Sequence, residues 1–318
     1  MNMPKTASVS LKKCESYRPE ILSQSLRECL EPLGGMRAFV RPNERILLKP
    51  NLVTTPSGDR PACTDADFVI EVARLVRECG AVPFISDSPA FGSARQVARQ
   101  IGLFQKAERE GIEICEMRGS ISREIRIDGK IHRLPVAATA IQADGIINLP
   151  KFKAHRQATF SFAVKNLYGC VPGKRKACRH FASGGDREWF SNMLVANALI
   201  LAPRLNLVDG IIGMEGQGPV RGTARDIGVI AAGVDPVAVD SICCEVAGCP
   251  PLSLCTQNAA RKMGAGVWDP EKINLLGDPL EDLRIKDFGF AREIPIFFSL
   301  PQLARSYLKS WRAALAPE

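Results

Sequence analysis

The sequence lacks the apolar segments that mark a membrane span or a secretion signal. No apolar run in its 318 residues approaches the roughly 18 residues that cross a bilayer, and residues 1–10 lack the apolar core of a signal peptide. Histidine is also scarce, and the three present form no His-Glu-x-x-His or similar metal-binding pattern. We therefore expect a cytoplasmic protein with no transmembrane segment and no histidine-based metal signature.

Cysteine is plentiful, with eleven in the chain, but its pattern does not match the usual cysteine sites. The odd count and the scattered positions favour reduced thiols over disulfides. The densest group, within residues 243–249, has neither ferredoxin spacing nor the paired Cys-x-x-Cys of a zinc ribbon. Most thiols are expected in the core and a ferredoxin-type iron–sulfur cluster is not supported, although Cys170, Cys178 and His180 stay open as an alternative metal set.

The overall composition is that of an ordinary globular protein. Hydrophobic residues make up 46% and charged residues 24% of the chain, which excludes disordered and collagen-like classes. The net charge of +8 is compatible with nucleic acid, an acidic membrane surface or an anionic small molecule. The basic residues are spread along the chain without a nucleic-acid motif, so nucleic acid is the least favoured partner.

Predicted strands alternate with predicted helices along most of the chain. This alternation indicates an α/β fold with a mainly parallel sheet and helices on both faces. The expected helices cover residues 19–33, 64–80, 93–101, 136–142, 160–168, 187–201 and a segment that begins at Asp235-Pro236. The expected strands cover residues 45–49, 81–86, 111–116, 124–134, 145–149, 205–208 and 226–232.

No linker, repeat or low-complexity stretch divides the chain. We therefore expect one α/β domain over residues 1–283 and a C-terminal appendage, 284–318, that forms a docked helix. Residues 294–315 mix aromatic and leucine side chains with Arg305, Lys309 and Arg312. An amphipathic helix that contacts a partner or a membrane surface is the alternative for this segment.

Polar clusters follow several of the predicted strands. Lys49-Pro50-Asn51, Asp87-Ser88-Pro89 and residues 150–155 each come directly after a strand, and Met214-Glu215-Gly216 lies a little beyond another. Ligands of open parallel sheets bind at the carboxyl ends of the strands, where the loops are not covered by helices. The polar loops are therefore predicted to meet there.

The most basic of these loops places several potential cations on one side. If the chain stays extended after Pro150, alternation puts Lys151, Lys153 and His155 together. Such a set is more easily kept when an anion fills the space between the cations, and a solvated face is the alternative. Lys165 lies in an otherwise apolar stretch, where an unpaired lysine is costly, so it is a better candidate than a surface lysine.

Carboxylates and glycines near the same loops have less specific patterns. The glycine-rich run of residues 213–222 lacks the Gly-Lys-Ser/Thr end of a phosphate-binding loop. Asp240 has helical spacing that turns it inward, where a carboxylate needs a partner, and a buried pair that holds a loop is one alternative. The other is a divalent cation held together with Asp87 and Glu215, because hard cations prefer carboxylate oxygens.

These patterns predict an enzyme that acts on a small anion bearing a carboxylate or phosphate, with a divalent metal ion as an optional aid. His155, Lys153 and Lys165 are the candidate catalytic residues, and His180 is a second histidine that titrates near neutrality. A non-catalytic anion carrier, or a component of a redox or cofactor-assembly system, is the alternative. The candidate ligand-binding residues are Lys49, Asn51, Lys151, Asn166, His180, Gly216 and Gly218.

The same loops resemble, in the same order, the family called domain of unknown function 362. The resemblance spans about residues 45–265, and its most specific parts are the lysine–histidine and Lys-Asn segments. The matching segments are Lys49-Pro50-Asn51, Asp87-Ser88-Pro89, Asn148 to His155, Val164 to Gly169, His180, Asp209-Gly210, Glu215 to Pro219 and Asp235 to Asp240.

The resemblance implies little about the reaction, because the shared activity of that family is unassigned. Some members look like iron–sulfur proteins through an added ferredoxin-like cysteine region, which this sequence lacks. The position often written Lys-Thr-His in the family is Lys153-Ala154-His155 here, so both basic groups are present and a hydroxyl is lost. No role for that hydroxyl carries over to this chain.

Overall fold

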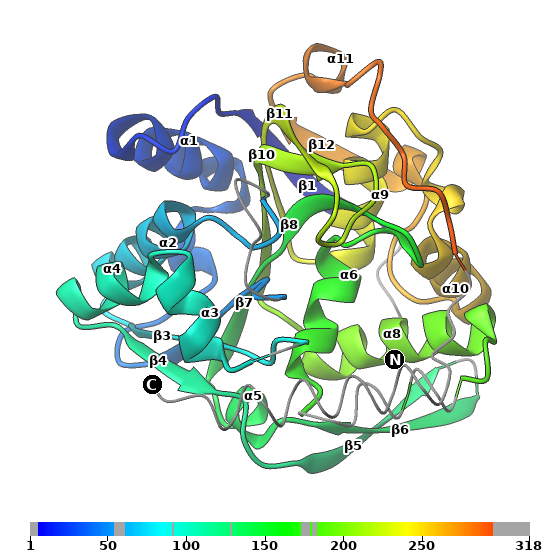
Figure 1. Cartoon of the computed structure of the whole chain (residues 1–318), viewed down its shortest axis with the longest axis horizontal. Helices are drawn as coiled ribbons and strands as arrows, with labels where there is room; N and C mark the ends of the chain where they lie inside the picture. Colours follow the sequence, from blue (N-terminus) through cyan, green and yellow to red (C-terminus); the bar gives the residue numbers. More distant parts are fainter. Residues whose placement is uncertain are drawn as a thin grey trace.

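A large twisted sheet runs through the middle of the molecule (Figure 1), as seen in a computed structural model that describes residues 6–53, 61–90, 92–127, 129–172, 179 and 183–294. Eight strands follow the order β12-β1-β11-β10-β7-β2-β3-β4, and β8 extends the sheet beside β10 and pairs with β9. The strands are β1 (Ala7–Lys13), β2 (Arg45–Pro50), β3 (Val82–Asp87), β4 (Glu113–Glu116), β7 (Gly145–Leu149), β8 (Lys151–His155), β9 (Thr159–Phe160), β10 (Leu205–Glu215), β11 (Thr223–Gly233) and β12 (Ile273–Gly277).

Most neighbouring strands of this sheet are parallel. Along the main order, the pairs of β11 with β1 and with β10 are antiparallel, and all the others are parallel. The α/β class with a mainly parallel sheet is therefore confirmed. A separate hairpin, β5 (Ile121–Ile127) and β6 (Lys130–Val136), lies at one end of the molecule.

Helices cover both faces of the sheet (Figure 1). Ile46 and Leu48 point into the core beneath α1 to α4, whereas Leu47 points into the core beneath α8 and α10, as the two-residue repeat of a strand requires. Among the described residues, no helix is both long and apolar enough to cross a membrane. The helices are α1 (Pro19–Leu30), α2 (Ala66–Glu78), α3 (Ala94–Gln100), α4 (Leu103–Arg109), α5 (Ala138–Ile141), α6 (Ala163–Asn166), α8 (Arg187–Leu201), α9 (Pro236–Val246), α10 (Cys255–Met263) and α11 (Leu280–Leu283).

The helix starts agree with the sequence in two cases and differ in one. The helix predicted from residue 93 begins there, with a capping box of Ser93 and Gln96 at the start of α3, and Asp235 caps α9 ahead of Pro236. The predicted helix of residues 64–80 begins one residue later, because the cap of α2 is Asp65 and Thr64 lies outside the helix. Thr64 instead donates its hydroxyl to the carbonyl at the end of β7, at 2.7 Å, and is used to join the loops of the site.

The segment from 160 to 168 is not the single helix that its apolar residues predicted. It contains β9, the short helix α6 and a 3-10 turn, η3 (Leu167–Cys170). Phe160 and Phe162 stack on each other with ring centroids 4.4 Å apart, and Phe162 also lies 4.7 Å from Phe152 of β8. This packing fixes an extended entry to α6, so tertiary contacts override the helical pattern.

The glycine-rich run of residues 213–222 also differs from its predicted loop. β10 and β11 extend well past residues 205–208 and 226–232, and they form a long antiparallel hairpin that includes Gly213 and Glu215. The C-terminal segment 284–294 (Figure 1, orange) contains no helix, and it contacts the β10–β11 hairpin through a hydrogen bond from Gly216 to Gly289. The rest of the predicted docked helix, residues 295–318, lies outside the described residues.

Candidate functional site

A buried ion pair joins the ends of β2 and β3. The Lys49 ammonium lies 2.8 Å from Asp87 Oδ1 and donates to the Pro50 carbonyl at 2.8 Å. Asp87 also accepts from the Leu52 amide at 2.8 Å. A Cβ on Gly169 would lie 2.1 Å from Asp87 Oδ1 and 2.5 Å from Lys49 Nζ, so only glycine fits over the pair. The two polar loops thus meet, as the parallel sheet predicted.

A second buried ion pair joins β8 to β10. The Lys151 ammonium lies 2.7 Å from Asp209 Oδ2 and donates to the Tyr17 hydroxyl at 2.8 Å, and that hydroxyl donates to Asp209 Oδ1 at 2.7 Å. The Asp65 amide adds a third contact to Asp209, at 2.9 Å. Burial and the neighbouring Asp209 charge raise the pKa of the Asp65 carboxyl. The charge of Lys151 is thus balanced within the protein by the Asp209 carboxylate.

Lys153 is buried differently, because it has no carboxylate partner among the described residues. Its ammonium donates to Asn51 Oδ1 at 2.9 Å and to the Ala62 carbonyl at 2.6 Å, and its side chain is 0% exposed. The pKa of Lys153 is lowered to about 7, mainly by burial; the charge of Cys63 opposes this shift and the Lys165 charge adds to it. A large fraction of this lysine is a neutral amine near pH 7.

Four buried asparagines connect Lys153 to the end of β11. Asn51 donates to Asn166 Oδ1 at 2.9 Å, Asn166 donates to Asn148 Oδ1 at 2.8 Å, and Asn148 donates to Asn206 Oδ1 at 2.8 Å. Asn206 then donates to the carbonyls of residues 233 and 234. Because each amide NH₂ donates in the same direction, the oxygen of Asn51 is left to accept from Lys153.

Lys165 is the lysine of the set that reaches the surface. It is partly exposed, yet burial of its ammonium group lowers its pKa to about 8, against the opposing effect of the nearby Cys255 thiol. No ion pair joins it to a carboxylate in the part of the chain that the structure describes. Lys165 and Lys153 therefore both lack an ion pair with a carboxylate among the described residues, and they lie within electrostatic reach of each other.

Of the two candidate histidines, His155 lies within the described residues and His180 does not. His155 lies at the end of β8, is buried, and accepts from the Gln157 amide through Nδ1 at 3.1 Å. A nitrogen that accepts carries no proton, so any proton on the neutral ring is on Nε2. His180 and Cys178 lie outside the described residues, and the candidate metal set that includes them stays a prediction.

The structure does not bring Asp87, Glu215 and Asp240 together as metal ligands. Asp87 pairs with Lys49, and Glu215 accepts from the amide of Gly289 at 3.0 Å. Asp240 accepts from two amides of α6, at 2.6 and 3.2 Å, and burial raises the pKa of its carboxyl well above the usual value. Within the described ranges, no group of three His, Cys, Asp or Glu side chains is placed to hold a metal ion.

Gly216 and Gly218, which are predicted to contact a ligand, have backbone contacts in the structure, and their ligand contacts stay a prediction. The Gly216 amide donates to the Gly289 carbonyl at 2.7 Å, and the Gly218 amide donates to the Gly216 carbonyl at 2.8 Å. A Cβ on Gly218 would lie 1.8 Å from the Ala154 carbonyl oxygen. Glycine is needed at 218 because the hairpin crosses closely over the end of β8.

Four residues of the network were not among the predicted site residues: Tyr17, Asn148, Asn206 and Asp209. Two of them carried a signal that could have identified them, because Asn148 and Asn206 interrupt the apolar strands Gly-Ile-Ile-Asn-Leu and Leu-Asn-Leu-Val. A polar residue in a buried strand needs a hydrogen-bonding partner inside the protein. Tyr17 lies far from the other loops in sequence, and nothing local marks it.

Fold and site together define an α/β protein with a buried lysine–asparagine network at the carboxyl ends of its parallel strands. The chain belongs to the family described as domain of unknown function 362, whose model matches residues 46–245. It is 41% identical over 303 residues to the thylakoid-associated protein sll1697 of Synechocystis sp., covering 95% of this chain and 94% of that protein.

A solved structure resembles the fold more loosely. The lactate racemase apoprotein from Thermoanaerobacterium thermosaccharolyticum superposes with a TM-score of 0.45 at 13% identity, over 74% of this chain and 57% of that one. A similarity of this extent carries no argument about activity.

Removal of the Asp209 charge should destabilise the protein strongly. Asp209→Asn leaves the Lys151 ammonium buried without a counter-charge, which costs about 3–5 kcal/mol in the free energy of unfolding. Urea unfolding measures this loss. The control is Glu78→Gln at the pair with Arg27, where both side chains are 51% exposed and the expected change is below about 1 kcal/mol. A loss for Asp209→Asn no larger than that of the control would contradict the assignment.

The depressed pKa of Lys153 should make stability depend on pH. Between its folded value of about 7 and its ordinary value of 10.5, the unfolded chain holds a proton on Lys153 that the folded protein has lost. Unfolding then takes up a proton, so stability rises with pH across this window, by up to about 1.4 kcal/mol per pH unit. The free energy of unfolding of wild type minus that of Lys153→Met should show this rise between pH 7 and 10. Parallel pH curves would refute it.

Proposed function

We propose that the protein is an enzyme that binds a small carboxylate- or phosphate-bearing substrate at Lys165 and transfers a proton with Lys153. The observation that carries this proposal is the unequal pairing of four lysines. Lys49 and Lys151 each have a carboxylate within 2.8 Å, whereas Lys153 has only neutral acceptors and Lys165 has no carboxylate among the described residues. A substrate anion would supply the missing counter-charge.

The two lysines that have no carboxylate partner among the described residues, Lys153 and Lys165, suit different roles. A lysine that is partly neutral near pH 7 can take up a proton from a substrate and return it, whereas an ordinary lysine is too strongly protonated to act as a base. Lys165 has exposed surface, so the anion is expected to approach there. Its charge would then stabilise negative charge that develops on the substrate during proton removal.

The hydrogen bonds around Lys153 support a positioning function for the asparagines. Asn51 holds the amine through its oxygen, and Asn166 fixes the amide of Asn51. Asn166 follows Lys165 in the chain, so one short helix, α6, places both the anion-binding lysine and the support of the proton-transfer lysine. Positioning of this kind fixes the amine with respect to the reacting atoms.

A panel of small carboxylates and phosphate monoesters, screened by thermal shift and followed by NMR, tests the proposal. Compounds that stabilise the wild type should be converted or should exchange a carbon-bound proton with deuterated solvent. Lys165→Met should lose the thermal shift. Lys153→Met should keep the shift but lower the exchange or conversion rate by at least about 100-fold.

The asparagine network supplies a matched control. Asn197→Leu removes another fully buried asparagine, which donates to the carbonyl of Leu167 on the same side of the sheet and is not part of the chain to Lys153. A folded Asn197→Leu protein should retain the turnover that Lys153→Met loses. If compounds bind through Lys165 without any turnover, the protein is a carrier and the enzymatic proposal is wrong.

We also propose that the chain attaches peripherally to an anionic membrane surface. Two observations support this: the similar Synechocystis protein is named thylakoid-associated, and the net charge of this chain is +8. Residues 294–315, largely outside the described structure, contain Arg305, Lys309 and Arg312 between aromatic and leucine residues. Basic side chains near such a surface each contribute about 1 kcal/mol of binding.

Vesicle co-sedimentation tests membrane attachment. The wild type should bind phosphatidylglycerol vesicles and not phosphatidylcholine vesicles, and the triple variant Arg305→Gln/Lys309→Gln/Arg312→Gln should bind about 100-fold more weakly. The matched control removes the same charge from α3 and α4, with Arg99→Gln/Lys106→Gln/Arg109→Gln. Equal losses in both triple variants would show that net charge alone is responsible.

A further inference from the structure

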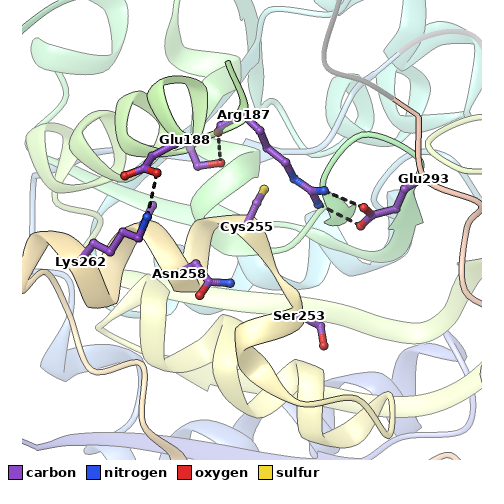
Figure 2. Close-up of a pocket in the computed structure, with 9 residues that line it drawn as sticks. Arg187, Glu188, Ser253, Cys255, Asn258, Lys262 and Glu293 are labelled. Carbon is purple, nitrogen blue, oxygen red and sulfur yellow. Dashed lines mark hydrogen bonds and ion pairs between the residues drawn. The ribbon is translucent and has the colours of Figure 1, made fainter. Parts of the chain in front are cut away.

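A cavity of about 340 Å³ opens to the surface between the start of α8 and the length of α10 (Figure 2). Arg187 and Glu188 line it from α8, and Cys255 and Lys262 line it from α10. Glu293 reaches into it from the C-terminal segment, so three parts of the chain that are distant in sequence meet there. The cavity is not part of the buried asparagine network described above.

Glu293 binds within this cavity as a ligand carboxylate would. Both of its oxygens accept from the Arg187 guanidinium, at 2.7 and 2.9 Å (Figure 2). The Thr159 hydroxyl donates to Glu293 Oε1 at 2.7 Å. This two-pronged contact is the geometry by which arginine recognises a carboxylate, and it lowers the pKa of the Glu293 carboxyl.

The backbone at Thr159 is held in an unfavourable conformation to make this contact. Thr159 has a φ of 60°, in the left-handed region that a β-branched residue rarely adopts. Such a conformation costs on the order of 1–3 kcal/mol and tends to persist at binding sites. The strain places a hydroxyl beside the carboxylate that Arg187 holds.

Cys255 links this cavity to Lys165. Its thiol lies against the Arg187 guanidinium, with which it forms a hydrogen bond, and it is also within electrostatic reach of the Lys165 ammonium. The cavity is therefore coupled electrostatically, through Cys255, to the lysine to which we assign the substrate anion. If Glu293 leaves, the basic side chains Arg187 and Lys262 face one remaining carboxylate, Glu188, and the cavity becomes net positive.

We propose that this cavity is a carboxylate-binding site for the substrate, in which Arg187 and Thr159 are the recognition groups and Glu293 fills the site when no ligand is bound. The inference rests on the proposed function for its assignment to the substrate. A ligand carboxylate exchanges places with the Glu293 carboxylate, and segment 284–294 moves away with it. The C-terminal segment is thus an internal competitor of the ligand.

The rate of alkylation of Cys255 measures how well a carboxylate-bearing reagent enters the cavity, and it can be measured before the substrate is identified. Iodoacetate carries a carboxylate and iodoacetamide does not, and mass spectrometry of the peptide that contains Cys255 measures the rate with each reagent. In Glu293→Gln, the ratio of the iodoacetate rate to the iodoacetamide rate should rise about two- to fivefold, because the competing carboxylate charge is gone. Succinate should slow the iodoacetate reaction of this variant more than that of the wild type.

Two further variants separate carboxylate recognition from loosening of the segment. Asp287→Asn removes another ion pair of the same segment, the one with Arg225, which lies outside the cavity, and should leave the ratio unchanged. Arg187→Gln combined with Glu293→Gln should abolish the gain. An equal increase with both reagents, no increase, or a gain that survives the loss of Arg187 would overturn the proposal. None of these readouts depends on Lys153 or turnover, so they can fail while the proposed activity stands.

Discussion

The desolvation of lysine at the carboxyl ends of the parallel strands is the constraint on which the site depends. A buried ammonium needs either a counter-charge or a shifted protonation equilibrium. Lys49 and Lys151 take the first course with Asp87 and Asp209, and Lys153 takes the second. Gly169 leaves room for the pair of Lys49 with Asp87. The asparagines that begin with Asn51 supply the neutral acceptor of Lys153.

The sheet makes this arrangement possible because it brings distant loops to one edge. β2, β3 and β7 are adjacent and parallel, so the residues that follow them come together although they are separated by dozens of positions in the chain. β8 continues from β7 after one proline and runs beside β10. Alternation along β8 then directs Phe152 into an aromatic cluster while its lysine neighbours turn to the polar network.

Much of the fold could be predicted from the sequence, because periodicity and caps are local signals. The strand after Glu44 and the helix from Arg187 to Leu201 were predicted nearly to the residue. The meeting of Lys49 with Asp87 followed from the general rule for parallel sheets. The irregular path through residues 160–168 was missed because it depends on aromatic contacts between separate elements.

The predicted site was less complete, since pairing is a long-range property. Lysines in a loop look alike in a sequence. Only the folded structure shows which of them are paired with a carboxylate and which are available to bind a ligand. Asp209 supplies the counter-charge of Lys151 and Tyr17 a hydrogen bond, from positions 58 and 134 residues away, so no local pattern could show that this lysine is paired. The carboxylates proposed for a metal were likewise each assigned by the fold to a different amide or lysine.

The row of asparagines has a consequence for how distant changes are felt. Its last member is anchored on main-chain carbonyls, which can only accept, and an amide that turned over along the row would lose its hydrogen bonds to both of its neighbours. The row therefore has a fixed polarity, like a row of dipoles aligned end to end. An aspartate at position 206 would still accept from Asn148, but its second oxygen would face the carbonyls of residues 233 and 234, so the row would keep its direction and lose its anchor.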